Sequence, residues 1–294
     1  MDERAVMITA FYYIKIKKME EIIMATKHNL NNIVIDRVLR GIFSDKEDNI
    51  IFSLNQVQNL SLNSTSESQD VVDALGVSIM ELMRSKAIEA SAENAIYDFG
   101  LLAAQYGTEK VEATTENKLV TPRMETFVAP KAEGGKMKYT LKHTPVAAPK
   151  FIYELNGDST LGAKYAKSGT TSTSATEFAY ADGAIELPTG IAEGTDMFVM
   201  YEYESDKAIE VVNRADQFAK MGKMTFEILA YDVCDPETKL FGYLTLPKFQ
   251  LSNDFDWSIG GDNQVHSFSG KAHVDYCSKD KQMVRVVLID DEEE

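Results

Sequence analysis

Apolar and polar residues alternate along much of the segment Lys223 to Val274, in the C-terminal third of the chain. Its first stretch places four apolar residues on one side of a two-residue repeat: Met224, Phe226, Ile228 and Ala230. A period of two is typical of a β-strand that turns one face toward a core. Turns rich in Asp, Pro and Gly interrupt the segment, and strands continue from Ala208 to Ile289. The pattern predicts a sheet and contains no catalytic motif.

The N-terminal part combines helical and strand-like patterns. Apolar residues between Asn31 and Gly41 recur at helical spacing, with Asn31 as a good cap and Gly41 suited to a left-handed stop. A short helix docked on the sheet is predicted there. From Asn49 the period changes to two, and the polar break at 56–59 leaves either one long strand with a bulge or two strands. A further strand is predicted over 88–93.

A tight turn is predicted between Asp73 and Gly76, because Asp in the first position and Gly in the fourth are preferences of a type I turn. The apolar pairs on either side favour a long hairpin near Ser61 to Ile79. The stretch 71–83 can alternatively be written as a helix.

A second helix is predicted after Asn94, which is a good cap, and before Gly107, which closes it. The residues at helical spacing are Ala95, Ile96, Phe99, Leu102, Ala103 and Tyr106.

The amino-acid composition changes between Thr121 and Lys150, where four of the seven prolines lie. This segment, predicted to be a loop or edge arm, carries six basic residues and two acidic ones, a local charge of +4 within a chain at −16. It is either a solvated loop or an arm that lies on an acidic neighbouring subunit.

These patterns divide the chain into five parts. They are 1–23, an N-terminal extension that is disordered or upstream of a true start at Met24; 24–150, the N-terminal part of a β domain with helices and the Pro-rich arm; 151–204, either an inserted β lobe or an extension of the main sheet; 205–289, the C-terminal strands of the same β domain; and 290–294, an acidic tail.

Charge and cysteine content narrow the function classes. Lys plus Arg total 30 against 46 Asp plus Glu, and the formal charge of −16 disfavours nonspecific binding to nucleic acid. The two cysteines are too few for a disulfide scaffold and are predicted to be reduced thiols. The apolar stretch 5–14 follows two acidic residues and precedes three lysines, the reverse of a secretory signal, and is too short to span a bilayer.

Candidate catalytic and metal-binding residues do not converge. His266 and His273 are seven residues apart in a strand-like segment, so they are predicted on opposite faces and are poor shared metal ligands. The Asp-rich stretch 254–262 lacks the spacing and the terminal Glu of an EF-hand loop and is interpreted as a turn with exposed acids. Cys234 has no cationic neighbour to activate it. We therefore predict no catalytic, cofactor-binding or metal-binding residues, and no enzyme activity.

Five aromatic residues leave two interpretations open. They are Trp257, Tyr201, Tyr203, Tyr231 and Tyr243. Either they form a sugar-binding platform or, as aromatics at alternating positions more often do, they supply sheet core and cross-strand pairs. The fold predicted from all these patterns is mainly β, a sandwich or barrel with one or two short packed helices.

The residues from 212 to 277 resemble the C-terminal region of virion structural proteins of tailed bacteriophages, in the tail-tube or major-tail-protein group. The shared order is a strand, an Asp-rich turn, a Gly-Tyr strand ending in Pro, a DFDxSxGGD segment and a final strand pair. The residues from 51 to 107 resemble that group's order of strand, long hairpin, strand and helix. The Pro-rich arm and the hydroxyl-rich stretch at 168–176 depart from it.

The resemblance implies a tail-tube-like subunit that forms hexameric rings, which stack into a tube in a virion assembled in the host cytoplasm. Its partners would be copies of itself and other virion proteins. DNA would pass without specific binding, because an acidic lumen repels phosphate, and no membrane is implied. Sheet edges and the long hairpin would join neighbouring subunits. Two alternatives stay open: another virion protein such as a capsid decoration or head-tail connector, and a sandwich-type module that binds glycans or a cell surface.

Overall fold

The computed structural model describes residues 32–170, 173–234, 237, 239–256, 260, 265–276 and 279–289. The chain divides into two compact units, the first formed by 1–109 with 211–294 and the second by 110–210. The predicted N-terminal extension, the start at Met24 and the acidic tail lie outside the described residues.

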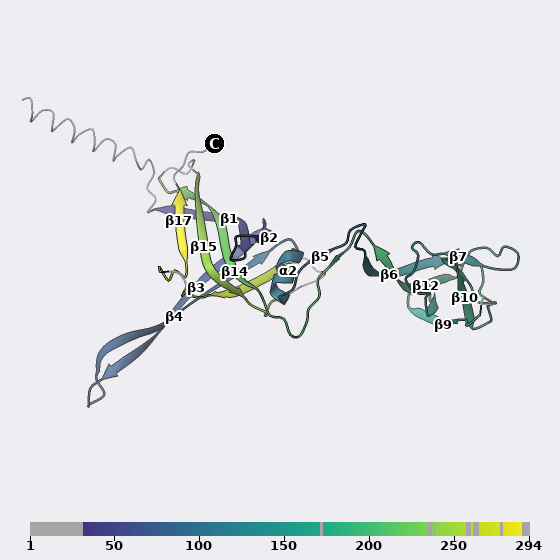
Figure 1. The fold of residues 1–294 in the computed structure, drawn as a ribbon, viewed down its shortest axis with the longest axis horizontal. Helices are drawn as coiled ribbons and strands as arrows, with labels where there is room; N and C mark the ends of the chain where they lie inside the picture. Colours follow the sequence, from purple (N-terminus) through teal and green to yellow (C-terminus); the bar gives the residue numbers. More distant parts are fainter. Residues whose placement is uncertain are drawn as a thin grey trace, which may run out of the picture. The chain divides into compact units, whose positions relative to one another are not determined.

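The first unit is built on an antiparallel sheet (Figure 1). Its strands are β1 (Ile33–Ser44), β2 (Ile50–Leu54), β3 (Val57–Val72), β4 (Ser78–Asn94), β14 (Met221–Asp232), β15 (Lys239–Leu251), β16 (His266–Ala272) and β17 (Arg285–Ile289). They follow the order β2-β1-β14-β15-β16-β4-β3, and β17 pairs with β15 beside β16. A short helix, α2 (Phe99–Tyr106), completes the unit, and the described part of the chain contains no helix long and apolar enough to cross a membrane.

The alternation predicted for β14 is confirmed. Met224, Phe226 and Ala230 have no solvent exposure, and Ile228 has 4%. Met224 and Phe226 pack in one cluster with large residues of β15 and β16, such as Phe249 and Phe268, and with the buried face of α2. Burial of each large side chain stabilises the fold by about 1.5–3 kcal/mol.

The helix predicted between Asn31 and Gly41 is wrong, because these residues form β1, which pairs with β14. Two register shifts, between Ile35 and Arg37 and between Val38 and Arg40, each insert one extra residue. The residues opposite the core positions of β14 are therefore Ile35, Val38 and Gly41, three apart rather than two. The bulges gave a strand the spacing of a helix, and Gly41 packs against Phe226 rather than ending a helix.

The predicted hairpin is confirmed and is longer than expected. β3 and β4 pair from Val57 with Asn94 to Val72 with Ser78, around a turn at Asp73. Of the two interpretations of 49–62, two strands is correct: β2 ends at Leu54 and β3 begins at Val57, within the predicted polar break. The strand predicted over 88–93 is the end of β4.

The second predicted helix exists but begins later than expected. Asp98, rather than Asn94, is the N-cap, and its carboxylate accepts a hydrogen bond from the Leu101 N–H at 2.7 Å. Asn94 is the buried last residue of β4, where its side-chain oxygen accepts from the Gln56 N–H at 3.2 Å. Gly107 ends the helix in the left-handed conformation, as predicted.

The second unit also consists of strands. They are β5 (Val111–Glu112), β6 (Leu119–Val128), β7 (Lys138–Thr140), β8 (Phe151–Leu155), β9 (Leu161–Lys167), β10 (Glu177–Ala181), β11 (Ala184–Glu186), β12 (Asp196–Ser205) and β13 (Ile209–Glu210). The main sheet has the order β6-β12-β8-β9-β10-β11-β7, in which β9 and β10 are parallel, and β5 pairs with β13. Its core includes the fully buried Ile152, Phe178, Ile185 and Met197.

The Pro-rich segment predicted as a loop or edge arm is partly a strand. β6 includes Pro122 and lies at the edge of the sheet in the strand order, where a residue without an N–H is tolerated. The second unit begins at Lys110, so it contains both this segment and the stretch 151–204.

Candidate assembly surfaces

The hairpin of β3 and β4 leaves the sheet as a two-stranded ribbon (Figure 1). β16 pairs with β4 only from Ile88 to Asn94, and among the described residues β3 pairs with β4 alone. Residues 61–81 and 83–87 are exposed. From Leu62 to Val72 such a strand extends about 33 Å, at about 3.3 Å per residue.

The turn at the end of the ribbon is held by one carboxylate. Asp73 Oδ1 accepts from the N–H groups of Leu75 at 2.8 Å and Val77 at 2.9 Å, and the Gly76 N–H donates to the Asp73 carbonyl at 3.0 Å. Gly76 takes a φ of 82°, a conformation that glycine adopts without strain. These hydrogen bonds therefore fix the backbone conformation of the turn that carries the exposed side chains.

The end of the ribbon, residues 71–83, is here called the tip. It exposes seven large apolar side chains: Val71, Val72, Leu75, Val77, Ile79, Met80 and Met83. Leu75 is 88% exposed. Successive strand residues point to opposite faces, so the pairs at 71–72 and 79–80 make both faces apolar. A free two-stranded ribbon can bury neither face, and exposed apolar patches of this kind mark contacts with other molecules.

Between the tip and the sheet the ribbon is polar, and this part is here called the neck, residues 63–70 and 84–87. Cross-strand hydrogen bonds hold it, from Ser85 to Glu67 at 2.9 Å and from Arg84 to Gln69 at 3.1 Å. Apolar character is therefore confined to the tip rather than spread along the ribbon.

A second apolar surface lies between β1 and β3, which contact one another although they are not neighbours in the sheet. This groove, of about 400 Å³, is here called the β1–β3 groove. Its apolar lining residues are Ile35, Val38, Val57, Leu60, Leu62, Ile228 and Leu244. Ile228 and Leu244 are buried, whereas Ile35 is 59% exposed although it occupies a core-facing position of β1. The core of the first unit is thus open along this groove.

A polar hollow of about 380 Å³ lies over β3, β4, β15 and β16. Ser61, Ser91 and Ser269 stand opposite one another on three successive strands. Beside them the Lys271 ammonium lies 3.0 Å from the Glu89 carboxylate.

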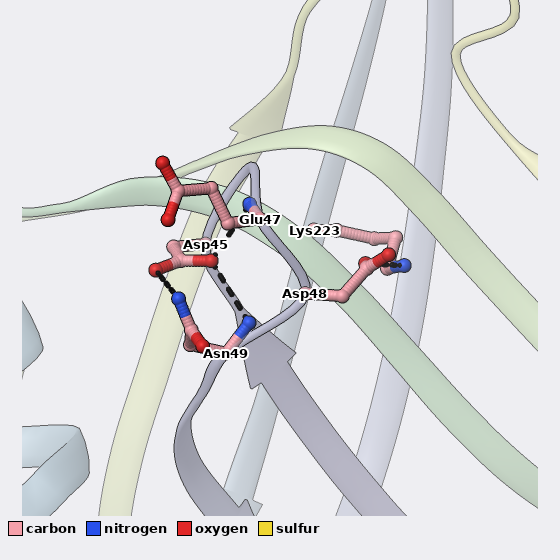
Figure 2. A network of polar contacts seen from close by, with 5 residues as sticks. All are labelled: Asp45, Glu47, Asp48, Asn49 and Lys223. Carbon is pink, nitrogen blue, oxygen red and sulfur yellow. Dashed lines mark hydrogen bonds and ion pairs between the residues drawn. The ribbon is translucent and has the colours of Figure 1, made fainter.

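The turn between β1 and β2 gathers acidic residues without forming a metal site (Figure 2). Asp45 accepts hydrogen bonds from the Glu47 N–H and from both the N–H and the amide group of Asn49, at 2.8–2.9 Å. The bonds from Asn49 lower the pKa of Asp45. Asp48 points instead to Lys223, with which it forms an ion pair. The carboxylate of Asp45 is thus used within the turn and that of Asp48 on β14.

A buried carboxylate organises one part of the second unit. Glu125 is 2% exposed, and it accepts the hydroxyl groups of Tyr139 at 2.6 Å and of Tyr201 at 2.7 Å. Burial favours the neutral acid, but the two hydroxyls, a backbone hydrogen bond from Lys142 and the positive charge of Lys142 together outweigh it, so the pKa of Glu125 is lowered. Burial and the bond to Glu125 raise the pKa of each tyrosine to about 12. Tyr201 is therefore a core residue and not part of an exposed sugar platform.

His266 is buried in β16, whereas His273 follows the end of this strand and is exposed. His266 Nε2 lies 2.8 Å from Gln105 Oε1 on α2, and burial lowers the pKa of His266. Cys234 is exposed, and its N–H donates to Asp232 at 2.8 Å. Within the described ranges no group of three or more His, Cys, Asp or Glu residues is placed to hold a metal ion. Trp257, Asp262 and Cys277 lie outside those ranges.

Sequence reasoning identified the hairpin but neither the apolar tip nor the groove as surfaces. The signal for the tip was present: Val71–Val72 and Ile79–Met80 break the alternation that a strand with one buried face shows. The sequence carries no such signal for the groove, because the bulges give β1 the spacing of a helix and β1 meets β3 only in the tertiary structure.

Comparison with known proteins yields one family. A family model described as YomU/Tube protein family matches residues 33–286. The match begins at the first residue of β1 and ends within β17, so it includes all of the second unit. No curated protein matches the chain.

Proposed function

Because this chain belongs to the YomU/Tube protein family, and is thus a structural protein of a bacteriophage tube and a virion component, we propose that its copies assemble into closed rings that stack into a tail tube. The rings are hexameric, and the tube conducts DNA. The protein acts without catalysis, and assembly takes place in the host cytoplasm together with other virion proteins.

The observation that carries the proposal is the ribbon of β3 and β4. A ribbon that projects from its sheet and ends in seven exposed apolar side chains is costly in a free monomer, because it leaves apolar area in water. The cost is removed when a neighbouring subunit covers the tip. Since the neck is polar, only the tip needs a partner, and the neck sets the distance between subunits.

The edges of the sheet support the same proposal. β3 is a strand of 16 residues that pairs on one side only among the described residues. Long strands with unpaired backbone groups serve as templates for strand addition by another chain. In a ring, the β3 edge of each subunit faces the sheet of the next subunit.

The acidic balance of the chain agrees with passage of DNA through the tube. At a net charge of −16, a wall made of many copies repels phosphate groups, so DNA is not held by ionic contacts. The local excess of basic residues at 121–150 is partly used within the second unit, where Lys136 pairs with Glu186 at 2.8 Å.

Negative-stain electron microscopy of the purified full chain, with sedimentation velocity at increasing protein concentration, tests this function. Tubes or six-fold rings are the expected result. Closed particles without an axial channel would indicate a head, decoration or connector protein instead. Stable monomers at all concentrations would overturn the proposal, and monomers retained by a glycan array would favour a binding module.

A further inference from the structure

We propose that the tip of one copy inserts into the β1–β3 groove of the next copy, so that subunits join head to tail. The inference rests on the proposed tube function and specifies its contact. The tip consists of residues 71–83, and the groove is centred on Ile35, Val38, Leu60 and Leu62.

The tip cannot fill the groove of its own chain. The groove contacts the beginning of β3, at Val57 to Leu62, whereas the tip begins at Val71. The two are joined by a ribbon with paired strands that extends about 33 Å from Leu62 to Val72. Bending it back would break the ladder between β3 and β4 along the neck. Any tip that enters this groove therefore belongs to a second molecule.

The two surfaces match in character. The groove is an opening into the hydrophobic core, with buried Ile228 and Leu244 as its floor and a volume of about 400 Å³. The tip offers Leu75 at the apex of a turn whose backbone is already ordered by Asp73, so little conformational entropy is lost on insertion.

Charge complementarity selects a second copy as the occupant. Asp70 and Glu81 stand directly opposite one another where the tip joins the neck, and like charges in that arrangement destabilise a strand pair. Arg37 lies at the groove with its side chain 67% exposed, 3.6 Å from Asp36. A tip seated in the groove brings its acidic pair toward this guanidinium group, which relieves the repulsion.

A contact between two different surfaces of one chain is heterologous, so it propagates from copy to copy and closes a ring when the rotation permits. Each subunit then supplies one tip and one groove. No additional protein is needed for the contact.

Complementation between two variants tests the contact. Leu75→Asp places a charge at the apex of the tip, and Leu62→Asp places one in the groove. Thr65→Asp in the neck is the matched control, and all three positions are exposed. We expect each of the first two variants alone to stay monomeric, with the concentration needed for assembly raised at least 10-fold, and the control to assemble like the unchanged chain. An equimolar mixture of the two variants has one intact tip and one intact groove, so it should form dimers that stop growing. Native mass spectrometry measures the species.

Charge reversal is an independent test, because it leaves the apolar contact intact. Arg37→Glu should weaken assembly, and combining it with Asp70→Arg and Glu81→Arg in the same chain should restore it. Equal circular dichroism spectra and thermal transitions for all variants establish that each one folds.

The outcomes separate the contact from the function. If the unchanged chain forms rings or tubes but the mixture gives no dimers, or if Leu75→Asp assembles normally, the tip-and-groove contact is wrong while the tube function stands. If cross-linking through Leu75→Cys joins two tips, the contact is tip to tip and the proposal fails. The Leu62→Cys thiol also reports what fills the groove. If it becomes accessible to a thiol label when residues 1–31 are deleted, but not when Leu75→Asp is introduced, the groove is filled by its own chain and the proposal also fails. If the unchanged chain never assembles, it is the tube function that fails.

Discussion

The carboxylate of Glu125 provides a quantitative prediction about the second unit. Tyr139→Phe and Tyr201→Phe each remove one hydroxyl donor, at 2.6 Å and 2.7 Å from the carboxylate, without changing the shape of the ring. A hydrogen bond to a charged group contributes about 1.5–3 kcal/mol to stability. Each variant should therefore lower the free energy of unfolding of this unit by that amount, a factor of roughly 10 to 150 in the opening equilibrium.

The effect should depend on pH in a defined direction. The pKa of Glu125 lies below its ordinary value of 4.5 in the folded state, so the carboxylate's contribution is complete above that value. It is lost as the pH falls through the lowered pKa, where the acid becomes neutral. The phenols, with a pKa of about 12, remain donors beyond pH 10. The loss caused by each Tyr→Phe variant should thus be constant from pH 6 to 9 and shrink in acid.

Hydrogen exchange of the full chain, followed by mass spectrometry of peptides from β6 and β12, measures this loss where it occurs. Tyr165→Phe is the matched control, because Tyr165 donates at 2.6 Å to Glu154, which is only half-buried, and its loss should be smaller. The reasoning is refuted if both tyrosine variants lose no more protection than the control. It is also refuted if their losses are equally large in a Glu125→Gln background, since a double-mutant cycle would then show no coupling.

Three further predictions concern the first unit. Gly107→Ala should lower the free energy of unfolding by about 3 kcal/mol, because residue 107 has a φ of 72° and the added Cβ would lie 2.0 Å from the Phe218 carbonyl oxygen. Gly76→Ala should lower it by only about 1 kcal/mol, because residue 76 has a φ of 82° but lies in open space. Thermal denaturation compares the two variants. Burial lowers the pKa of His266 from 6.5, so as the pH falls below 6.5 the unfolded chain binds a proton before the folded chain does, and stability should fall. The denaturant midpoints at pH 5 and pH 7.5 should therefore differ less for His266→Gln than for the unchanged chain. Asp98→Ala removes the N-cap of α2 and should destabilise the helix by about 1 kcal/mol. The amide hydrogens of the helix should then exchange faster, and unchanged exchange would contradict the capping role.

Local patterns were sufficient for several elements. The two-residue repeat of β14, the Asp and Gly of the hairpin turn and the glycine that ends α2 depend on interactions within a few residues, and the structure confirms all three. Asn94 shows the limit of such patterns, because Asn and Asp are both good caps. Which of Asn94 and Asp98 became the cap was decided by the pairing of β4 with β16, which keeps residue 94 in a strand.

The candidate surfaces divide in the same way. The apolar residues of the tip are visible in the sequence, since they interrupt the expected alternation. The groove is not, because two bulges give β1 a helical spacing and because Ile35 and Leu62, on different strands, line one groove only in the tertiary structure. The Glu125 network is equally hidden, since Tyr139 and Tyr201 lie 14 and 76 residues away along the chain.

By itself the sequence determined a mainly β protein with a long hairpin, a short helix and an acidic balance, because alternation, turn chemistry and charge are properties of neighbouring residues or of composition. Only the tertiary structure decided where strands pair out of register, which core positions remain open to solvent, and that the ribbon is too long to cover its own groove. Those outcomes depend on contacts between residues far apart in the chain, which no local pattern encodes.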